Sequence, residues 1–161
     1  MNRNYNVDEI LAMAEEIERN GAEYYARAAQ ITEGEEKKAK LQKLAEMERN
    51  HERIFAEMRA SQPAEQASFD PDGEAGRYLG AIVDGKVFDY QSAPAADLAG
   101  KSLVDIYRKA IDLEKDSIIF YLGIRELVPE GFGNAQMDDI IHEEMGHIVL
   151  LSDELTKEIE G

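Results

Sequence analysis

Four stretches of this chain place apolar residues at every third or fourth position, the spacing that puts them on one face of an α-helix. The positions between them are mostly charged or polar, as expected for the solvated face of the same helix. Each stretch is far longer than an ordinary strand. The pattern therefore predicts four long amphipathic helices, at about residues 8–31, 35–60, 102–128 and 134–159.

Short polar motifs indicate where three of these helices should begin. Asn6 is followed three residues later by Glu9, which is the spacing of a capping box. Ser102 and Asp105 stand in the same relation at the start of the third helix. We expect Asn134 to cap the fourth helix.

The connections between the predicted helices set their arrangement. Only a few residues separate the first helix from the second and the third from the fourth, so each pair should form an antiparallel hairpin. The two hairpins are joined by a stretch of about 40 residues, 61–101, which holds three of the four prolines. Because this crossover loop is long enough to travel the length of a bundle, the expected fold class is an all-α four-helix bundle with one long crossover.

The crossover loop contains one pattern of its own. Residues 78–90 hold two short apolar runs on either side of Asp84 and Gly85. Asp-Gly is a favoured two-residue turn between paired strands, so we interpret this segment as a small β-hairpin.

The composition excludes several classes of function. A chain of 161 residues fits one domain, which we expect to span residues 1–161. The net charge of −16 argues against nucleic acid or an anionic membrane as a partner and favours cations. The lack of cysteine excludes disulfides, thiolate zinc sites, iron–sulfur clusters and a cysteine nucleophile. No apolar run is long enough for a signal peptide or a membrane span, so we expect a cytoplasmic protein.

Six ionisable side chains interrupt the apolar faces of the four predicted helices. Each lies at helical spacing from apolar neighbours on its own helix, so it should point into the core with them. A buried charge is strongly unfavourable unless something compensates it. The six residues are Glu18, Glu48, His51, Glu114, Glu144 and His147.

These residues belong to an internal repeat. Adding 96 to the residue number carries one helical hairpin onto the other. Such a repeat implies approximate two-fold symmetry, with equivalent side chains meeting at the centre of the bundle. The corresponding pairs are Glu18 and Glu114, Tyr25 and Tyr121, Glu48 and Glu144, and His51 and His147.

Ordinary structural roles compete with this interpretation. A single helical glutamate usually lies on the solvated face, but the shared offset argues against that role for the whole set. Tyr25 and Tyr121 fit two roles equally well, as core tyrosines that hydrogen-bond a carboxylate or as redox-active groups at a catalytic site. His142 should lie on the surface, and Met145 should fill the core.

The spacing of the six residues suits a pair of metal ions. A Glu-x-x-His motif on a helix aims a carboxylate and an imidazole the same way, one turn apart. Two such motifs and two further glutamates form the ligand pattern of di-iron and di-manganese carboxylate bundles. Without thiolate, the set suits two iron ions or manganese better than copper, although zinc could bind in vitro. The His-Glu-x-x-His motif of zinc peptidases is absent.

On these residues, the chain resembles the ferritin-like superfamily and, within it, the rubrerythrin-type and bacterioferritin-type di-iron proteins. The resemblance covers residues 8–60 and 102–158 and does not extend to the crossover loop. It implies bridging roles for one pair of glutamates, terminal roles for the other pair, and one histidine on each iron. The carriers are Glu18, Tyr25, Glu48, His51, Glu114, Tyr121, Glu144 and His147, with Glu48 and Glu144 as the bridging pair.

Two departures qualify the resemblance. Rubrerythrins usually carry an extra carboxylate three residues after the ligand of the third helix, where this chain has Ser117. The rubredoxin electron-transfer domain is also missing, as the lack of cysteine requires. The ligand set therefore resembles the symmetrical four-Glu, two-His site of bacterioferritin.

Three functions follow as expectations. The first is a peroxidase or ferroxidase that oxidises Fe(II) with peroxide or dioxygen and relies on an external electron donor. The second is the subunit of an iron-storage shell, and the third is a bundle that binds metal only for stability. Ile118, Ile119, Phe120 and Leu122 cannot all face one core, so we expect part of this group to lie in a homodimer interface.

Overall fold

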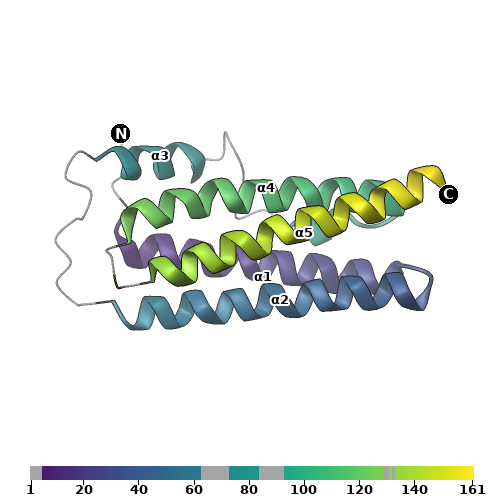
Figure 1. The fold of residues 1–161 in the computed structure, drawn as a ribbon, viewed down its shortest axis with the longest axis horizontal. Coiled ribbons are helices and arrows are strands. Elements are labelled where there is room, and N and C mark those ends of the chain that lie inside the picture. The colour runs from purple at the N-terminus through teal and green to yellow at the C-terminus, as the bar shows by residue number, and fades with distance from the viewer. Residues whose placement is uncertain (1–4, 63–72, 84–92, 129–130, 132) are drawn as a thin grey trace.

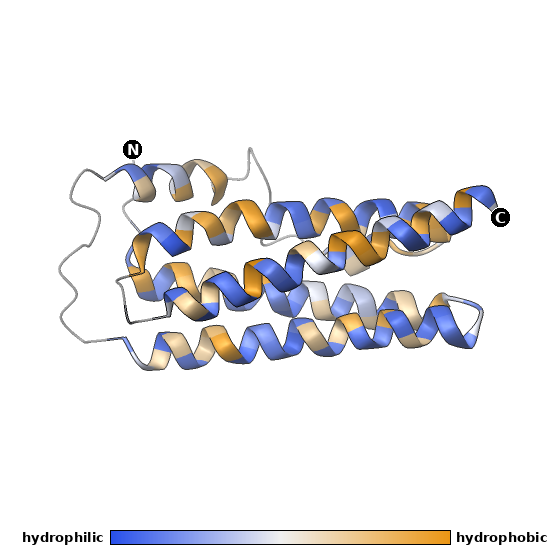
Figure 2. Cartoon of the chain, in the orientation of Figure 1, coloured by the Kyte–Doolittle hydropathy of each residue, from blue (hydrophilic) through white to orange (hydrophobic). Residues whose placement is uncertain are grey.

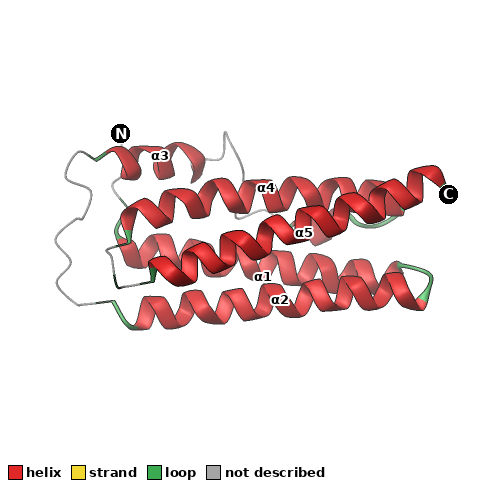
Figure 3. Ribbon diagram, in the orientation of Figure 1, coloured by secondary structure: helices red, strands yellow, loops and turns green. Residues whose placement is uncertain are grey.

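The computed structural model describes residues 5–62, 73–83, 93–128, 131 and 133–161. Within these residues the secondary structure is entirely helical (Figure 3). The elements are α1 (Val7–Ile31), α2 (Glu35–Ala60), α3 (Glu74–Val83), the 3₁₀ helix η1 (Pro94–Asp97), α4 (Leu103–Leu127) and α5 (Asn134–Glu160).

The four long helices form the predicted bundle with one crossover. Helices α1 and α2 pack as one hairpin and α4 and α5 as the other, while α1 also contacts α4 and α2 contacts α5. Helix α2 ends at one end of the bundle and α4 starts at the other, so the connection between them spans the length of the bundle (Figure 1). The predicted fold class is therefore confirmed, and the bounds of the long helices differ from the prediction by one residue or less.

Two of the three predicted caps are confirmed, and the third is wrong. Asn6 and Glu9 form a reciprocal capping box, and the Ser102 hydroxyl accepts a hydrogen bond from the backbone N–H of Asp105. At the start of α5 the capping position is held by Gly133, whose φ of 129° favours glycine. Asn134 is instead the first helical residue, and its side-chain amide donates to the carbonyl of Val128, 3.1 Å away.

The crossover contains a helix where we expected a loop with a β-hairpin. Residues 78–83 lie in α3, and Asp84 and Gly85 fall outside the described residues. Leu79, Ile82 and Val83 are buried, and α3 packs on α4. Their spacing of three and four residues is helical, so the apolar run that suggested a strand belongs to a short amphipathic helix.

The core consists of two apolar clusters, one toward each end of the bundle. All four long helices carry apolar and polar residues in alternation along their length (Figure 2). The first cluster includes Leu11, Phe55, Phe120 and Ile140. The second cluster includes Tyr24, Leu41, Tyr107 and Leu151.

Several apolar side chains remain on the surface. Ile119 is 38% exposed and Leu122 is 46% exposed, whereas Phe120 is fully buried. The group thus divides between core and surface, and the homodimer stays a prediction. Met145, which we expected in the core, is 47% exposed. None of the described helices is both long and apolar enough to span a membrane.

Candidate metal centre

All four long helices contribute to one buried cluster of acids and histidines. Helix α1 supplies one glutamate, α4 supplies another, and α2 and α5 each supply a Glu-x-x-His pair. No member is more than 4% exposed. The structure thus brings together Glu18, Glu48, His51, Glu114, Glu144 and His147.

The cluster divides into two overlapping groups of four. One group consists of Glu18, Glu48, His51 and Glu144, and the other of Glu48, Glu114, Glu144 and His147. Within each group, one potential ligand atom per residue lies within 4.8 Å of every other. Glu48 and Glu144 belong to both groups, which is the arrangement that two neighbouring cations would need.

Both histidines face the carboxylates through Nδ1. His51 Nδ1 lies 2.7 Å from Glu144 Oε1 and 3.4 Å from Glu18 Oε2. His147 Nδ1 lies 3.2 Å from Glu48 Oε1 and 3.3 Å from Glu114 Oε1. The two rings are stacked, with centroids 5.9 Å apart and planes inclined by 22°. Each imidazole therefore aims the same nitrogen at its own group of carboxylates.

Two tyrosines reach between α1 and α4 and hold the carboxylates of Glu18 and Glu114. The hydroxyl of Tyr25 on α1 donates to Oε1 of Glu114, and the hydroxyl of Tyr121 on α4 donates to Oε1 of Glu18. Both tyrosines are at most 2% exposed. The structure thus shows the hydrogen-bonding role for this pair, and the repeat makes the two contacts symmetrical.

Burial strongly perturbs the acids of the cluster. Burial, followed by repulsion from neighbouring carboxylates, raises the pKa of Glu18 and of Glu144 well above the ordinary value. The pKa of Glu48 is raised for the same two reasons. Glu114 is the exception: burial alone would raise its pKa, but its contacts with Glu144, His147 and Tyr25 outweigh that effect and lower it.

The pKa values of both histidines are raised, although burial alone would lower them. Burial alone would lower the pKa of His51, but its contacts with Glu144 outweigh that effect and raise the pKa to about 9. The carboxylates around His147, Glu114 first, raise its pKa in the same way. The cluster therefore attracts positive charge, either protons or metal cations.

Unpaired buried atoms test whether the cluster fits a metal. Within the described part of the chain, several ligand atoms have no hydrogen-bond partner of acceptable geometry, which is costly for buried polar groups. A metal ion would satisfy carboxylate oxygens and imidazole nitrogens together. The unpaired ligand atoms are Glu18 Oε2, Glu48 Oε1, both Oε atoms of Glu144, and Nδ1 of His51 and His147. The buried cluster fits a two-metal site.

Two further residues shape the cluster and were not singled out from the sequence. A Cβ atom on Gly21 would lie only 2.8 Å from Glu48 Oε2, so this α1 position must be small. Glu143, next to Glu144, lies 2.6 Å from Nε2 of His51. The sequence signal that could have identified Glu143 is its position directly before the Glu-x-x-His motif of α5. Ser117, the departure from rubrerythrins, is buried and donates its hydroxyl hydrogen to the carbonyl of Leu113.

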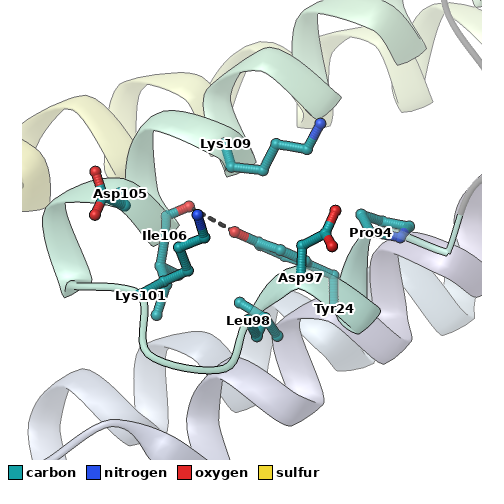
Figure 4. A pocket seen from close by; sticks show the side chains of 8 residues that line it. All are labelled: Tyr24, Pro94, Asp97, Leu98, Lys101, Asp105, Ile106 and Lys109. Atoms are coloured by element: carbon teal, nitrogen blue, oxygen red, sulfur yellow. Dashed lines mark hydrogen bonds between the residues drawn. The ribbon is translucent and has the colours of Figure 1, made fainter.

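A surface pocket of about 270 Å³ lies apart from the cluster (Figure 4). It opens between η1 and the start of α4, and Asp97, Lys101 and Lys109 are among the residues that line it. Between two of its lining residues, the hydroxyl of Tyr24 donates to the carbonyl of Ile106, 2.9 Å away. None of its lining residues belongs to the acid cluster, so the pocket is not part of the candidate metal centre.

Comparison with known proteins bears on the fold. The sequence matches no protein-family model, and no curated protein is significantly similar to it. A crystal structure from Thermotoga maritima, assigned as that of a ferritin-like diiron-carboxylate protein, superposes with a TM-score of 0.71. The likeness covers 97% of this chain and 98% of that one, at 22% sequence identity. The resemblance inferred from the sequence is thus supported at the level of architecture, and this chain has a ferritin-like fold.

Proposed function

We propose that this protein is a di-iron oxidoreductase, a rubrerythrin-like peroxidase or ferroxidase that oxidises Fe(II) with peroxide or dioxygen. The observation that carries the proposal is the pair of overlapping ligand groups that share Glu48 and Glu144. A cluster built only for stability would need no such sharing. A ferritin-like fold adds support, because such bundles build di-iron and di-manganese sites in their cores.

The donor atoms are those of an iron or manganese site. Carboxylate oxygens and imidazole nitrogens without thiolate suit iron or manganese. Four carboxylates also balance two divalent cations when both histidines are neutral. When bound, two ferrous ions can supply two electrons together, which with two protons reduce one peroxide to two waters.

The protein would hold and shield the ions. Glu48 and Glu144 would each reach both ions, whereas Glu18 and Glu114 would each reach one. Tyr25 and Tyr121 fix the terminal carboxylates through their hydroxyl groups. The apolar clusters on either side of the acids keep bulk water from the site.

Repeated turnover would need an electron donor from outside. Residues 1–161 contain no cysteine, so none of them can form an iron–sulfur or rubredoxin centre that would return electrons to oxidised iron. We therefore propose a small reductant or a partner protein as the donor.

The proposal is tested by anaerobic loading with Fe(II) followed by rapid mixing with hydrogen peroxide or with dioxygen. We expect two ions per chain and oxidation of both in one fast phase with at least one of the two oxidants. Glu48→Ala and His147→Ala should lose metal stoichiometry and oxidation together, because each would remove a member of the two overlapping groups.

His142→Ala is the matched control, because His142 lies on α5 but is exposed and outside the cluster. It should bind two ions and react like the wild type. Equally slow oxidation of the bound Fe(II) by both oxidants would contradict the proposal that the protein is an enzyme. Unaltered loading in both cluster variants would show that the ligands are misassigned.

A further inference from the structure

The two halves of the cluster differ in what lies behind each histidine. Nε2 of His51 lies 2.6 Å from Oε2 of Glu143. Nε2 of His147 is buried and has no hydrogen-bond partner among the residues that the structure describes. The outer nitrogen of one imidazole is therefore paired, and that of the other is not.

The internal repeat explains this difference. Adding 96 carries His51 onto His147 and Met47 onto Glu143. Because Glu143 on α5 pairs with His51 on α2, symmetry makes Met47 on α2 the counterpart for His147 on α5. A thioether sulfur is only a weak acceptor, so the second half of the repeat lacks an equivalent carboxylate.

The contact with Glu143 bears on which ring nitrogen of His51 carries a hydrogen. An ionised carboxylate can only accept, so beside ionised Glu143 the imidazole carries its hydrogen on Nε2. A neutral ring then keeps its lone pair on Nδ1, the nitrogen that faces Glu18 and Glu144. A carboxylate behind a metal-binding histidine also orients the ring and makes it a stronger ligand.

We propose that Glu143 is a positioning residue that makes the two metal positions unequal. The His51 position (Glu18, Glu48, His51 and Glu144) would fill first and bind more tightly than the His147 position (Glu48, Glu114, Glu144 and His147). The inference rests on the proposed two-metal function and adds an order of binding and its cause.

The order can be tested by anaerobic titration with Co(II), followed by visible absorption and calorimetry. The wild type should bind two ions in steps that differ by at least about tenfold in affinity. Glu143→Ala should weaken the tighter step by about 10- to 100-fold and leave the weaker step unchanged. Glu143→Gln, which retains an acceptor for Nε2–H, should recover part of the loss.

A gain-of-function variant tests the same idea from the other half. Met47→Glu places a carboxylate at the corresponding position and should tighten the weaker step, so that the two affinities converge. Glu46→Ala, which changes an exposed glutamate beside Met47, is the matched control and should leave both steps as in the wild type. Circular dichroism of the metal-free variants checks that they remain folded.

A spectroscopic measurement separates positioning from general stability. In the zinc-loaded protein, the Nε2–H proton of His51 should give a slowly exchanging NMR signal that is absent in Glu143→Ala. Equal affinities in the wild type, or an equal loss of both steps in Glu143→Ala, would overturn the inference and leave the two-metal site intact. Failure of the wild type to bind two ions would instead overturn the proposed function.

Discussion

Gly21 on α1 leaves room for the carboxylate of Glu48 on α2, because a Cβ at position 21 would lie 2.8 Å from Oε2. Contacts that short are not tolerated, so one of the two groups would have to move. The repeat places another small residue, Ser117, at the equivalent position of α4. Both halves of the repeat therefore carry a small residue at this position. In the first half, that residue lies against Glu48, which belongs to both groups of the cluster.

Gly21→Ala should weaken metal binding without weakening the fold. Alanine in a helix interior is more stable than glycine by about 0.5–1 kcal/mol. The clashing atom is the end of a flexible side chain, so Glu48 can turn away at little cost to folding. We expect at least a tenfold loss of Co(II) or Fe(II) affinity, measured by calorimetry, with an unchanged or higher melting temperature of the metal-free protein.

Gly146→Ala on α5 is the control, because a Cβ there meets no atom within 4 Å. It should stabilise the protein by about 0.5–1 kcal/mol and leave metal affinity unchanged. If both glycine variants bound metal like the wild type, the close approach of Gly21 to Glu48 would have no part in the site.

Tyr25→Phe and Tyr121→Phe should each weaken the site by removing one hydroxyl donor. Glu114 and Glu18 would then lose a hydrogen bond in a buried position, where an unsatisfied group costs about 1–3 kcal/mol. Loss of a partner behind a metal ligand typically lowers affinity by about 10- to 100-fold. Calorimetric titration of the two variants measures the effect.

Tyr107→Phe separates this effect from the loss of any buried hydroxyl. Tyr107 is 1% exposed, and its hydroxyl has no hydrogen-bond partner among the described residues. This variant should bind metal as the wild type does. If Tyr25→Phe kept full affinity but lost a radical signal after oxidation, the redox role would replace the positioning role.

Metal should stabilise the protein more strongly as the pH rises. Glu18, Glu48 and Glu144 have pKa values raised above 4.5, and that of His51 is raised from 6.5 to about 9. A raised folded-state pKa contributes stability that is present below the unfolded value and is lost as the pH rises through the folded value. The metal-free protein should therefore lose stability between about pH 4.5 and pH 9.

Divalent cations compete with protons for these ligands, so their contribution should run the other way. The rise in melting temperature caused by Mn(II) should be small near pH 5 and large near pH 8, as measured by differential scanning calorimetry. The lowered pKa of Glu114 opposes the trend of the metal-free protein but concerns one group only. A shift by Mn(II) that did not depend on pH would contradict this account.

The long helices and the six residues of the buried cluster could be predicted because each leaves a periodic signal. Apolar spacing defines α1, α2, α4 and α5, and the offset of 96 identifies residues that interrupt it symmetrically. Gly21 and Glu143 leave weaker signals. A glycine on an inward face has many explanations, and Glu143 is one of 34 acidic residues until the fold brings it to His51.

Helix α3 was missed for a different reason. It has only ten residues, and its surroundings are rich in proline and glycine, so the local composition favoured a loop. Its stability comes from contact with α4, which no short sequence window contains. Tyr78 reaches across to donate a hydrogen bond to the carbonyl of Ile119, 2.8 Å away.

Gly123 on α4 allows α3 to pack so closely. A Cβ at this position would lie 2.6 Å from Leu79 Cδ2 and 2.8 Å from the ring of Tyr78. Overpacking of this kind typically costs about 1–3 kcal/mol. Gly123→Ala should therefore loosen α3 and increase amide hydrogen exchange over residues 74–83, while Co(II) binding stays unchanged, because the atoms nearest to the new Cβ belong to α3.

Gly80→Ala, within α3 itself, is the matched control. A Cβ at position 80 meets nothing within 4 Å, so this variant should slow exchange in α3 through its higher helix propensity. Opposite shifts in the two variants would show that contact with α4 holds this helix in place. If Gly123→Ala instead showed the same exchange rates as the wild type over residues 74–83, α3 would tolerate a side chain at position 123. The close approach of α3 to Gly123 would then not be what holds this helix in place.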